Sequence, residues 1–273
     1  MSQEEAATVL SKVEGGTAWL TINRPKKLNA LSSEVVTTLR KKVEEFNEDD
    51  NVRIIVLGGV GKAFSVGYDI AEEVEAGIER PEDWHAALTR NVGLSMAVWA
   101  SHKPTIAAVD GWCLAGACEL AMACDLIVAT DRSQFGEPEI RFGSGPVTLL
   151  MPFLIGQKKT NELLLTGDVI SAAEAEKIGM INYAVAPDAL EETVNKLAAK
   201  IAITPLITLK LTKIALARAY EAMGLRQAVN ANLDVAATLN AAYSPEKAEF
   251  GRRVKADGLR AALDWRDTRY GKL

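Results

Sequence analysis

The sequence predicts an α/β core followed by a helical C-terminal part. Two β-branched runs, at residues 52–57 and 105–109, are typical of strands that are buried on both faces of a parallel sheet. Strands that alternate with helical stretches favour an α/β arrangement over a β-sandwich. After Thr204-Pro205 the spacing of apolar residues is helical to the end. We therefore expect a core in residues 1–203 and a helical oligomerisation subdomain in residues 204–273.

The first half of the core has clear element signals. Residues 17–24 alternate apolar and polar side chains up to Pro25, which predicts a strand that the proline ends. Ser32 or Ser33 then caps a predicted helix that runs to residue 49. Its apolar side is formed by five residues. These are Val35, Val36, Leu39, Val43 and Phe46.

The remaining elements are read in the same way. Residues 125–129 predict a third buried strand, and residues from 171 onward turn helical. The acidic link at 71–83 is either a mobile helical insertion over a site or a solvated connector. Three helical stretches follow the proline, and they cover residues 206–221, 225–242 and 245–271.

Composition narrows the class of protein. Apolar residues make up 48% of the 273-residue chain, and a net charge of −5 gives no broad field that would attract nucleic acid. Three clustered cysteines favour a reducing compartment. The first residues are acidic where a signal peptide carries Lys or Arg, so no signal peptide is predicted. No apolar run is long enough to cross a membrane, so no membrane span is predicted. We expect a cytoplasmic protein that binds neither nucleic acid nor membranes.

Metal and nucleotide chemistry is disfavoured. The two histidines, His85 and His102, have no partners at metal-ligand spacing, so no metal site is predicted. The glycine turn at 59–62 lacks the third glycine of a dinucleotide loop and the Ser or Thr of a P-loop. Ser65 lies in a segment similar to a nucleophile elbow, but no histidine follows residue 102 to serve as its base. Cys113, Cys118 and Cys124 are interpreted as core residues.

Three segments contain residue types whose burial is hard to explain by a structural role alone. They are residues 63–70, 110–125 and 134–143. Glu119 is the only charged residue of a small apolar helix that opens at Gly116, so we expect a buried carboxyl group. Glu137, Glu139 and Arg141 alternate, so one of those acids could face solvent or pair with the arginine. Two nearby buried carboxyl groups have their pKa values pushed apart, which suits one as a base and the other as an acid. Backbone N–H groups at glycine-rich turns hold an oxyanion, so the set suits an acyl compound whose carbonyl becomes enolate-like.

At these segments the chain resembles the crotonase (enoyl-CoA hydratase/isomerase) superfamily. Five stretches carry the resemblance, in the order typical of that family. They are residues 23–31 (NRPKKLNAL), 63–70 (AFSVGYDI), 103–129 (KPTIAAVDGWCLAGACELAMACDLIVA), 135–143 (FGEPEIRFG) and 163–182 (LLLTGDVISAAEAEKIGMIN). The resemblance implies a spiral of repeated ββα units, a coenzyme A thioester substrate without a metal or redox cofactor, and assembly into a homotrimer or homohexamer.

Matched residue by residue, the resemblance places the oxyanion-hole N–H groups on Tyr68 and Gly116 and the two catalytic glutamates on Glu119 and Glu139. We expect Glu119 to activate the water and Glu139 to deliver the proton at the α-carbon. Arg266 is expected to reach a coenzyme A phosphate on a neighbouring subunit. The other expected substrate-binding residues are Lys27, Leu28, Ala30, Ala63, Ser65, Val66, Asp69, Ile70, Ala71 and Trp112, together with Tyr68 and Gly116.

The predicted activity is the hydration of a 2-enoyl-CoA, or the reverse dehydration. The glycine triplet of the family is Ala115-Gly116-Ala117 here, and the loop after Glu139 looks shorter than in fatty-acid hydratases. Tyr68 and Trp112 are bulky residues nearby, and residues 111–113 (GWC) are similar to hydroxycinnamoyl-CoA hydratase-lyases. The acyl group of the substrate could therefore be branched, cyclic or aromatic. The isomerase, acyl-CoA hydrolase and hydratase-lyase reactions of the family also remain alternatives. A serine hydrolase and a non-catalytic acyl-CoA binding protein are the alternatives outside it.

Overall fold

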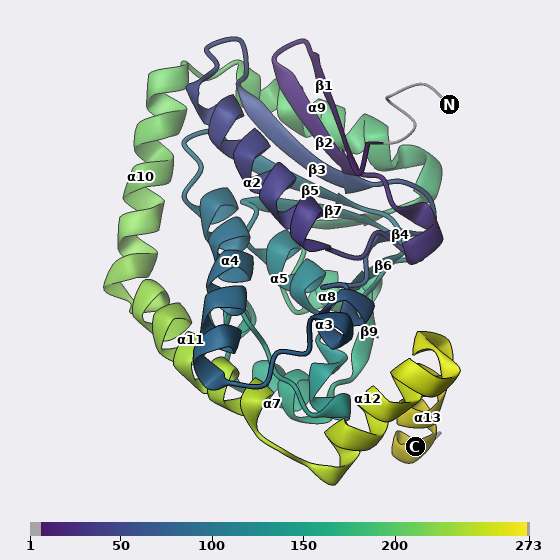
Figure 1. The fold of residues 1–273 in the computed structure, drawn as a ribbon. Coiled ribbons are helices and arrows are strands. Elements are labelled where there is room, and N and C mark those ends of the chain that lie inside the picture. The colour runs from purple at the N-terminus through teal and green to yellow at the C-terminus, as the bar shows by residue number, and fades with distance from the viewer. Residues whose placement is uncertain (1–6, 272–273) are drawn as a thin grey trace.

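A computed structural model describes residues 7–271 of the protein (Figure 1). The acidic N-terminal segment, in which no signal peptide is predicted, includes residues 1–6, and these lie outside the described residues. A six-stranded sheet has the order β1-β2-β3-β5-β7-β10, in which only the β1–β2 pair is antiparallel. Its strands are β1 (Val9–Glu14), β2 (Thr17–Ile22), β3 (Ile54–Gly59), β5 (Thr105–Val109), β7 (Leu126–Thr130) and β10 (Tyr183–Val185).

A second, four-stranded sheet has the order β4-β6-β8-β9. Its strands are β4 (Ala63–Ser65), β6 (Trp112–Leu114), β8 (Gln134–Gly136) and β9 (Val169–Ser171). The pairs β4–β6 and β6–β8 are parallel, and β9 runs antiparallel to β8.

The two sheets are built by one repeated unit. A strand of the large sheet (β3, β5 or β7) is followed each time by a strand of the small sheet (β4, β6 or β8) and then by a helix. Because β3, β5 and β7 are neighbours in one sheet and β4, β6 and β8 in the other, each unit is displaced by one strand from the last. This is the spiral of ββα units that the family resemblance implies, and the fold class is confirmed.

Helices cover both faces of the large sheet. Ile55 and Leu57 of β3 belong to the main hydrophobic core with α2, whereas Ile54 and Val56 pack with Val194 of α9 on the other face. The strand is therefore buried on both sides, as its continuous apolar run predicts. The helices of the core are α2 (Ser33–Glu48), α3 (Ile70–Ala76), α4 (Pro81–Trp99), α5 (Gly116–Met122), α6 (Met151–Leu154), α7 (Gln157–Thr166), α8 (Ala172–Lys177) and α9 (Leu190–Ala202), with 3-10 turns η1 (Pro25–Lys27), η2 (Pro138–Phe142) and η3 (Pro187–Ala189).

Helices follow the core, as predicted, but the described residues form four rather than three, because Gly258 divides the predicted stretch at 245–271. They are α10 (Leu206–Ala222), α11 (Leu225–Ala241), α12 (Pro245–Asp257) and α13 (Leu259–Tyr270). Figure 1 shows α10 and α11 running along the outside of the molecule and α12 and α13 ending near η2 and α3. Leu225, Val229 and Leu233 of α11 enter the main hydrophobic core beside α4. The predicted boundary at residue 203 lies between α9 and α10 and stays a prediction.

The acidic link at 71–83 is helical rather than a simple connector. Asp69 caps α3 by accepting a hydrogen bond from the amide of Glu72, and α4 begins at Pro81. Helix α4, strand β1 and the three-residue strands of the small sheet were not predicted from the sequence. None of the helices within residues 7–271 has the length and apolar character needed to cross a membrane.

Candidate active site

The small sheet brings the three sequence-predicted segments side by side. β4, β6 and β8 are adjacent and parallel, so the residues that follow them leave the same edge. These residues are Tyr68 after β4, Gly116 after β6 and Glu139 after β8. Ligands of α/β sheets bind outside the carboxyl ends of the strands, and this edge is where the candidate site lies.

Among residues 7–271, the amides of Tyr68 and Gly116 have no protein partner. Leu31 pairs with the chain on either side of Tyr68, because its amide donates to the Gly67 carbonyl at 2.8 Å and its carbonyl accepts from the Asp69 amide at 3.2 Å. Gly116 is the first residue of α5, where a helical amide has no acceptor. Within residues 7–271 neither amide donates a hydrogen bond, so both can bind an oxygen atom of a ligand.

A close approach of two turns holds these amides together. Gly67 has a φ of +91°, and a Cβ on it would lie 2.6 Å from the Cβ of Ala115. Ala115 itself has a φ of 56°, and its amide donates to the Gly136 carbonyl at 2.8 Å. The turn before α5 is therefore pinned to β8 on one side and to residue 67 on the other.

Glu119 is buried at the centre of this arrangement. Its side chain is 0% exposed, and its Oε1 accepts hydrogen bonds from the amides of Val147 and Thr148, at 2.5 and 2.7 Å. Its Oε2 has no hydrogen-bond partner in the described part of the chain. Burial raises the pKa of Glu119 to about 7, against the pull of the two amide hydrogen bonds.

Glu139 lies close enough for the two carboxyl groups to influence each other. It is buried in η2, and its Oε2 likewise lacks a partner among residues 7–271. Burial and then the charge of Glu119 raise the pKa of Glu139 well above its usual range. The structure therefore brings together the two glutamates that the sequence singles out.

Two further acidic residues belong to the same surroundings. Glu137 is only 3% exposed, and its pKa is raised well above normal by burial and by the charges of Glu119 and Glu139. Glu73 of α3 has its pKa raised to about 7, first by burial and then by the charge of Asp69. Glu73 was not predicted as a site residue because it lies in an acidic run that is typical of a solvated helix.

The alternative that Glu137 or Glu139 faces solvent or pairs with Arg141 is wrong. Arg141 pairs with Asp168, and both glutamates are buried. The alternation at 137–141 does not describe an extended strand because Pro138 begins a 3-10 turn, in which side chains three apart share a side.

Residues 24–31 lie against the loop that carries Tyr68. Asp69 forms an ion pair with Arg24 at 2.9 Å and a longer one with Lys27 at 3.4 Å. Asn29 is fully buried, and its amide group donates to the carbonyls of Val60 and Ala63. Asn29 was not singled out from the sequence, and its left-handed φ of 58° is the feature that only the structure reveals.

The expected substrate-binding residues lie mainly near the loop that carries Tyr68, with Trp112 as the exception. Most of them stand on the two segments joined by the Leu31–Tyr68 bridge, namely Lys27, Leu28, Ala30, Ala63, Ser65, Val66, Asp69, Ile70 and Ala71. Trp112 instead has an exposed side chain on β6, on the opposite face of the strand from buried Cys113. Contacts of these residues with a substrate stay a prediction.

Arg266 lies near the carboxyl groups of its own chain. It stands on α13, pairs with Asp267 at 2.8 Å and has a mostly buried side chain. Its positive charge opposes the rise in the pKa of Glu139, which places the two in one neighbourhood. The contact of Arg266 with a coenzyme A phosphate on a neighbouring subunit stays a prediction.

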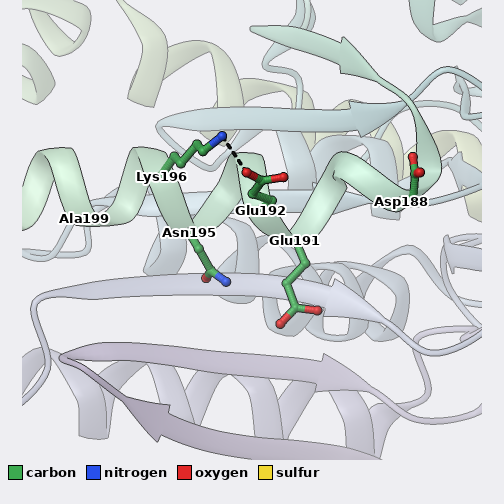
Figure 2. A pocket seen from close by; sticks show the side chains of 6 residues that line it. All are labelled: Asp188, Glu191, Glu192, Asn195, Lys196 and Ala199. Carbon is green, nitrogen blue, oxygen red and sulfur yellow. Dashed lines mark ion pairs between the residues drawn. The ribbon is translucent and has the colours of Figure 1, made fainter.

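A depression of about 600 Å³ on η3 and α9 is separate from these residues (Figure 2). Figure 2 shows most of its lining side chains on α9 and Asp188 on the turn η3 before it. Lys196 and Glu192 form an ion pair there at 2.6 Å. Every lining side chain is exposed. The depression therefore has no buried titratable group, unlike the site at the edge of the small sheet.

Comparisons with known proteins identify the family. A model of the enoyl-CoA hydratase/isomerase family matches residues 12–250. The chain is 37% identical over 258 residues to a probable enoyl-CoA hydratase of Rhizobium meliloti (strain 1021), covering 90% of this chain and 98% of that protein. It is 36% identical over 211 residues to a crotonyl-CoA hydratase of Syntrophomonas wolfei, covering 76% and 80%.

A solved structure gives the same result. The crystal structure of an enoyl-CoA hydratase/isomerase from Xanthobacter autotrophicus Py2 superimposes with a TM-score of 0.94 and 39% identity, covering 96% of this chain and 98% of that chain. These matches confirm the resemblance on which the site residues were selected. The chain belongs to the enoyl-CoA hydratase/isomerase family.

Proposed function

We propose that this protein is an enoyl-CoA hydratase, which adds water across the 2,3 double bond of a 2-enoyl-CoA thioester or catalyses the reverse dehydration. The observation that carries the proposal is a pair of buried carboxyl groups, Glu119 and Glu139, together with two amides, of Tyr68 and Gly116, that donate to no acceptor within residues 7–271. The relatives named as hydratases support the same activity.

The two glutamates divide the proton chemistry by their pKa values. Glu119 titrates at about 7, so at neutral pH a large fraction is ionised and can accept a proton from water. The negative charge of ionised Glu119 adds to the effect of burial in raising the pKa of Glu139, so Glu139 stays protonated and can act as the acid. The water oxygen bonds to C3 while its proton passes to Glu119, and Glu139 gives its proton to C2.

The free amides stabilise the charge that develops between these steps. As the water oxygen bonds to C3, the electron pair of the double bond moves toward the thioester oxygen, which becomes enolate-like. The amides of Tyr68 and Gly116 would donate to that oxygen, and amide donors fixed in place need no rearrangement during the reaction. No metal or redox cofactor is needed for these steps, and the absence of one stays a prediction.

The serine hydrolase alternative has little support. The Ser65 hydroxyl is buried in β4 and accepts a hydrogen bond from the Gly67 amide at 3.3 Å. In the described residues no histidine nitrogen bonds to this hydroxyl, and His85 pairs instead with Asp234. A serine nucleophile needs an adjacent base, so Ser65 is assigned a local structural role.

We also propose assembly into a homotrimer or homohexamer in a reducing, cytoplasmic setting. The support for assembly is that α10 has no buried residue and that large apolar side chains on and beside it are exposed. They are Ile203, Ile207, Leu211, Leu216 and Met223. Exposed large apolar side chains gathered on one helix are typical of a protein–protein interface. The support for a reducing compartment is that the three cysteines are buried and unpaired by disulfides.

A spectrophotometric screen of 2-enoyl-CoA esters tests the proposed function. The panel covers short straight, branched, cyclic and aromatic acyl groups, and loss of the conjugated enoyl thioester absorbance reports hydration. We expect turnover of at least one ester. Affinity for the esters without turnover of any of them would instead indicate a non-catalytic acyl-CoA binding protein, and release of free coenzyme A would indicate a hydrolase.

A further inference from the structure

The side chain of Tyr68 covers the glycine that supplies the second free amide. A Cβ placed on Gly116 would lie 2.2 Å from Cε2 of the Tyr68 ring and 2.7 Å from both Cδ2 and Cζ. Real Cβ atoms do not approach other atoms so closely, so the ring fills the space in which a side chain at residue 116 would stand. The edge of the ring that runs from Cδ2 through Cε2 to Cζ is the part that lies there.

The backbone on both sides of Tyr68 is held in place. Leu31 bonds to Gly67 and Asp69, the residues before and after the tyrosine. Asp69 is also tied to Arg24 and caps α3. The ring packs against the main hydrophobic core. Its position over Gly116 is therefore a fixed feature of the fold.

The ring also lies near the groups proposed for catalysis. Gly116 and Glu119 are three residues apart on α5 and share a face of that helix. Burial and then the charges of Glu119, Glu73, Glu139 and Glu137 raise the pKa of the Tyr68 phenol well above 10, so it stays protonated. Tyr68 is thus a neutral, bulky side chain on the side of α5 where the carboxyl groups are gathered.

We propose that Tyr68 determines acyl specificity, its ring admitting an unbranched 2-enoyl group and excluding a substituent on C2. This inference rests on the proposed function. An oxygen held by the Tyr68 and Gly116 amides has C2 only two bonds away, so C2 lies beside the ring that covers Gly116. A hydrogen on C2 needs little room there, whereas a methyl group competes with the ring for the same space.

Paired substrates test the proposal. The measured quantity is the ratio of kcat/KM for 2-methylcrotonyl-CoA to kcat/KM for crotonyl-CoA, which does not depend on how much of a variant is folded. We expect a ratio well below one in the unchanged protein. Tyr68→Ala should raise the ratio at least about tenfold, since one methyl group in a fitted pocket changes kcat/KM by about 10-fold to 200-fold. Tyr68→Phe keeps the ring and should keep the original ratio.

A binding measurement separates this inference from the proposed function. The dissociation constants of butanoyl-CoA and 2-methylbutanoyl-CoA, measured by calorimetry, should show the same discrimination and the same relief in Tyr68→Ala without any turnover. If no enoyl-CoA is hydrated but the binding ratio shifts, the proposed function fails and the role of Tyr68 stands. A protein that binds and hydrates both partners of each pair equally, or a Tyr68→Ala variant with unchanged ratios, overturns the inference.

Discussion

The amide of Thr148 donates a hydrogen bond of 2.7 Å to Oε1 of Glu119. The Val147 amide donates to the same oxygen, so one side of this buried carboxyl group is fully occupied by backbone. Oε2 is left without a partner in residues 7–271. The segment at 147–148 therefore orients Glu119 and leaves Oε2 as the oxygen available for proton transfer.

Substitutions of Glu119 should separate its structural and chemical roles. Glu119→Gln keeps an oxygen for both amides and should fold normally. Glu119→Ala leaves two buried N–H groups unsatisfied and should lower the free energy of unfolding by about 2 kcal/mol or more. Urea unfolding followed by circular dichroism measures both variants, and equal stability of the two would show that the amide contacts are unimportant.

Burial of Glu119 should also make stability depend on pH. Its pKa is raised from 4.5 to about 7 in the folded protein, so the folded state binds the proton more tightly than the unfolded state between these values. The contribution of this group to stability is therefore present below pH 4.5 and is lost as the pH rises to 7. The total loss is about 3 kcal/mol.

The comparison of the unchanged protein with Glu119→Gln isolates this effect. The variant should gain stability relative to the unchanged protein as the pH rises from 4.5 to 7, because its amide does not titrate. Glu192→Gln, at an exposed position on α9, serves as the control and should show no such trend. A stability difference between the protein and Glu119→Gln that is constant from pH 4.5 to 7 would contradict the burial effect.

The contact between Tyr68 and Gly116 predicts a coupled pair of substitutions. Gly116→Ala should lower the free energy of unfolding by about 1–3 kcal/mol, because its methyl group overlaps the tyrosine ring. In a Tyr68→Ala background the same change should cost little, which a double-mutant cycle measures. Gly251→Ala on α12 is the control, since a Cβ there meets no atom within 4 Å. Additive effects at residues 68 and 116 would show that the two do not touch.

The ion pair between Arg24 and Asp69 should stabilise the loop that carries Tyr68. Burial favours the neutral form of Asp69, but hydrogen bonds from Arg24 and the Glu72 amide bring its pKa below the usual 3.8. Arg24→Ala should therefore lower the free energy of unfolding by about 2 kcal/mol or more at pH 7. The stabilising contribution of the ionised Asp69 is present above pH 3.8 and is lost as the pH falls through its lower, folded pKa.

Thermal unfolding at several pH values checks this prediction. Lys196→Ala removes the exposed pair with Glu192 and provides the control, which should match the unchanged protein. The deficit of Arg24→Ala should shrink toward the acid end of the range. A deficit at pH 7 no larger than that of Lys196→Ala would show that the loop is held by other contacts.

Much of the fold was predictable because its main elements have strong periodicity. The buried strand β5 matches the predicted residues 105–109, and Ser32 caps α2 as expected. The three-residue strands of the small sheet are too short to show a period of two. Helix α4 was missed because its buried face includes the polar residues Asn91 and Ser95, which weaken the apolar pattern.

The candidate site was predictable where chemistry stood out against its local sequence. Glu119 is the one acid of an apolar helix, and its burial is confirmed. Glu137 could not be separated from Glu139 because the 3-10 turn at Pro138 alters the direction of both side chains. The position of the Tyr68 ring depends on a contact with Gly116, which is 48 residues away along the chain, and no local pattern encodes such a contact.

The most direct test of the central claim is the hydration rate of one accepted 2-enoyl-CoA by the unchanged protein, Glu119→Gln and Glu139→Gln, with binding of the saturated acyl-CoA measured in parallel. Each variant should lose at least about 100-fold in kcat, since general acid–base groups contribute about 10²- to 10⁴-fold. Both should bind the saturated ester nearly as well as the unchanged protein. Full activity in both variants would contradict the assignment of the two carboxyl groups as the catalytic pair.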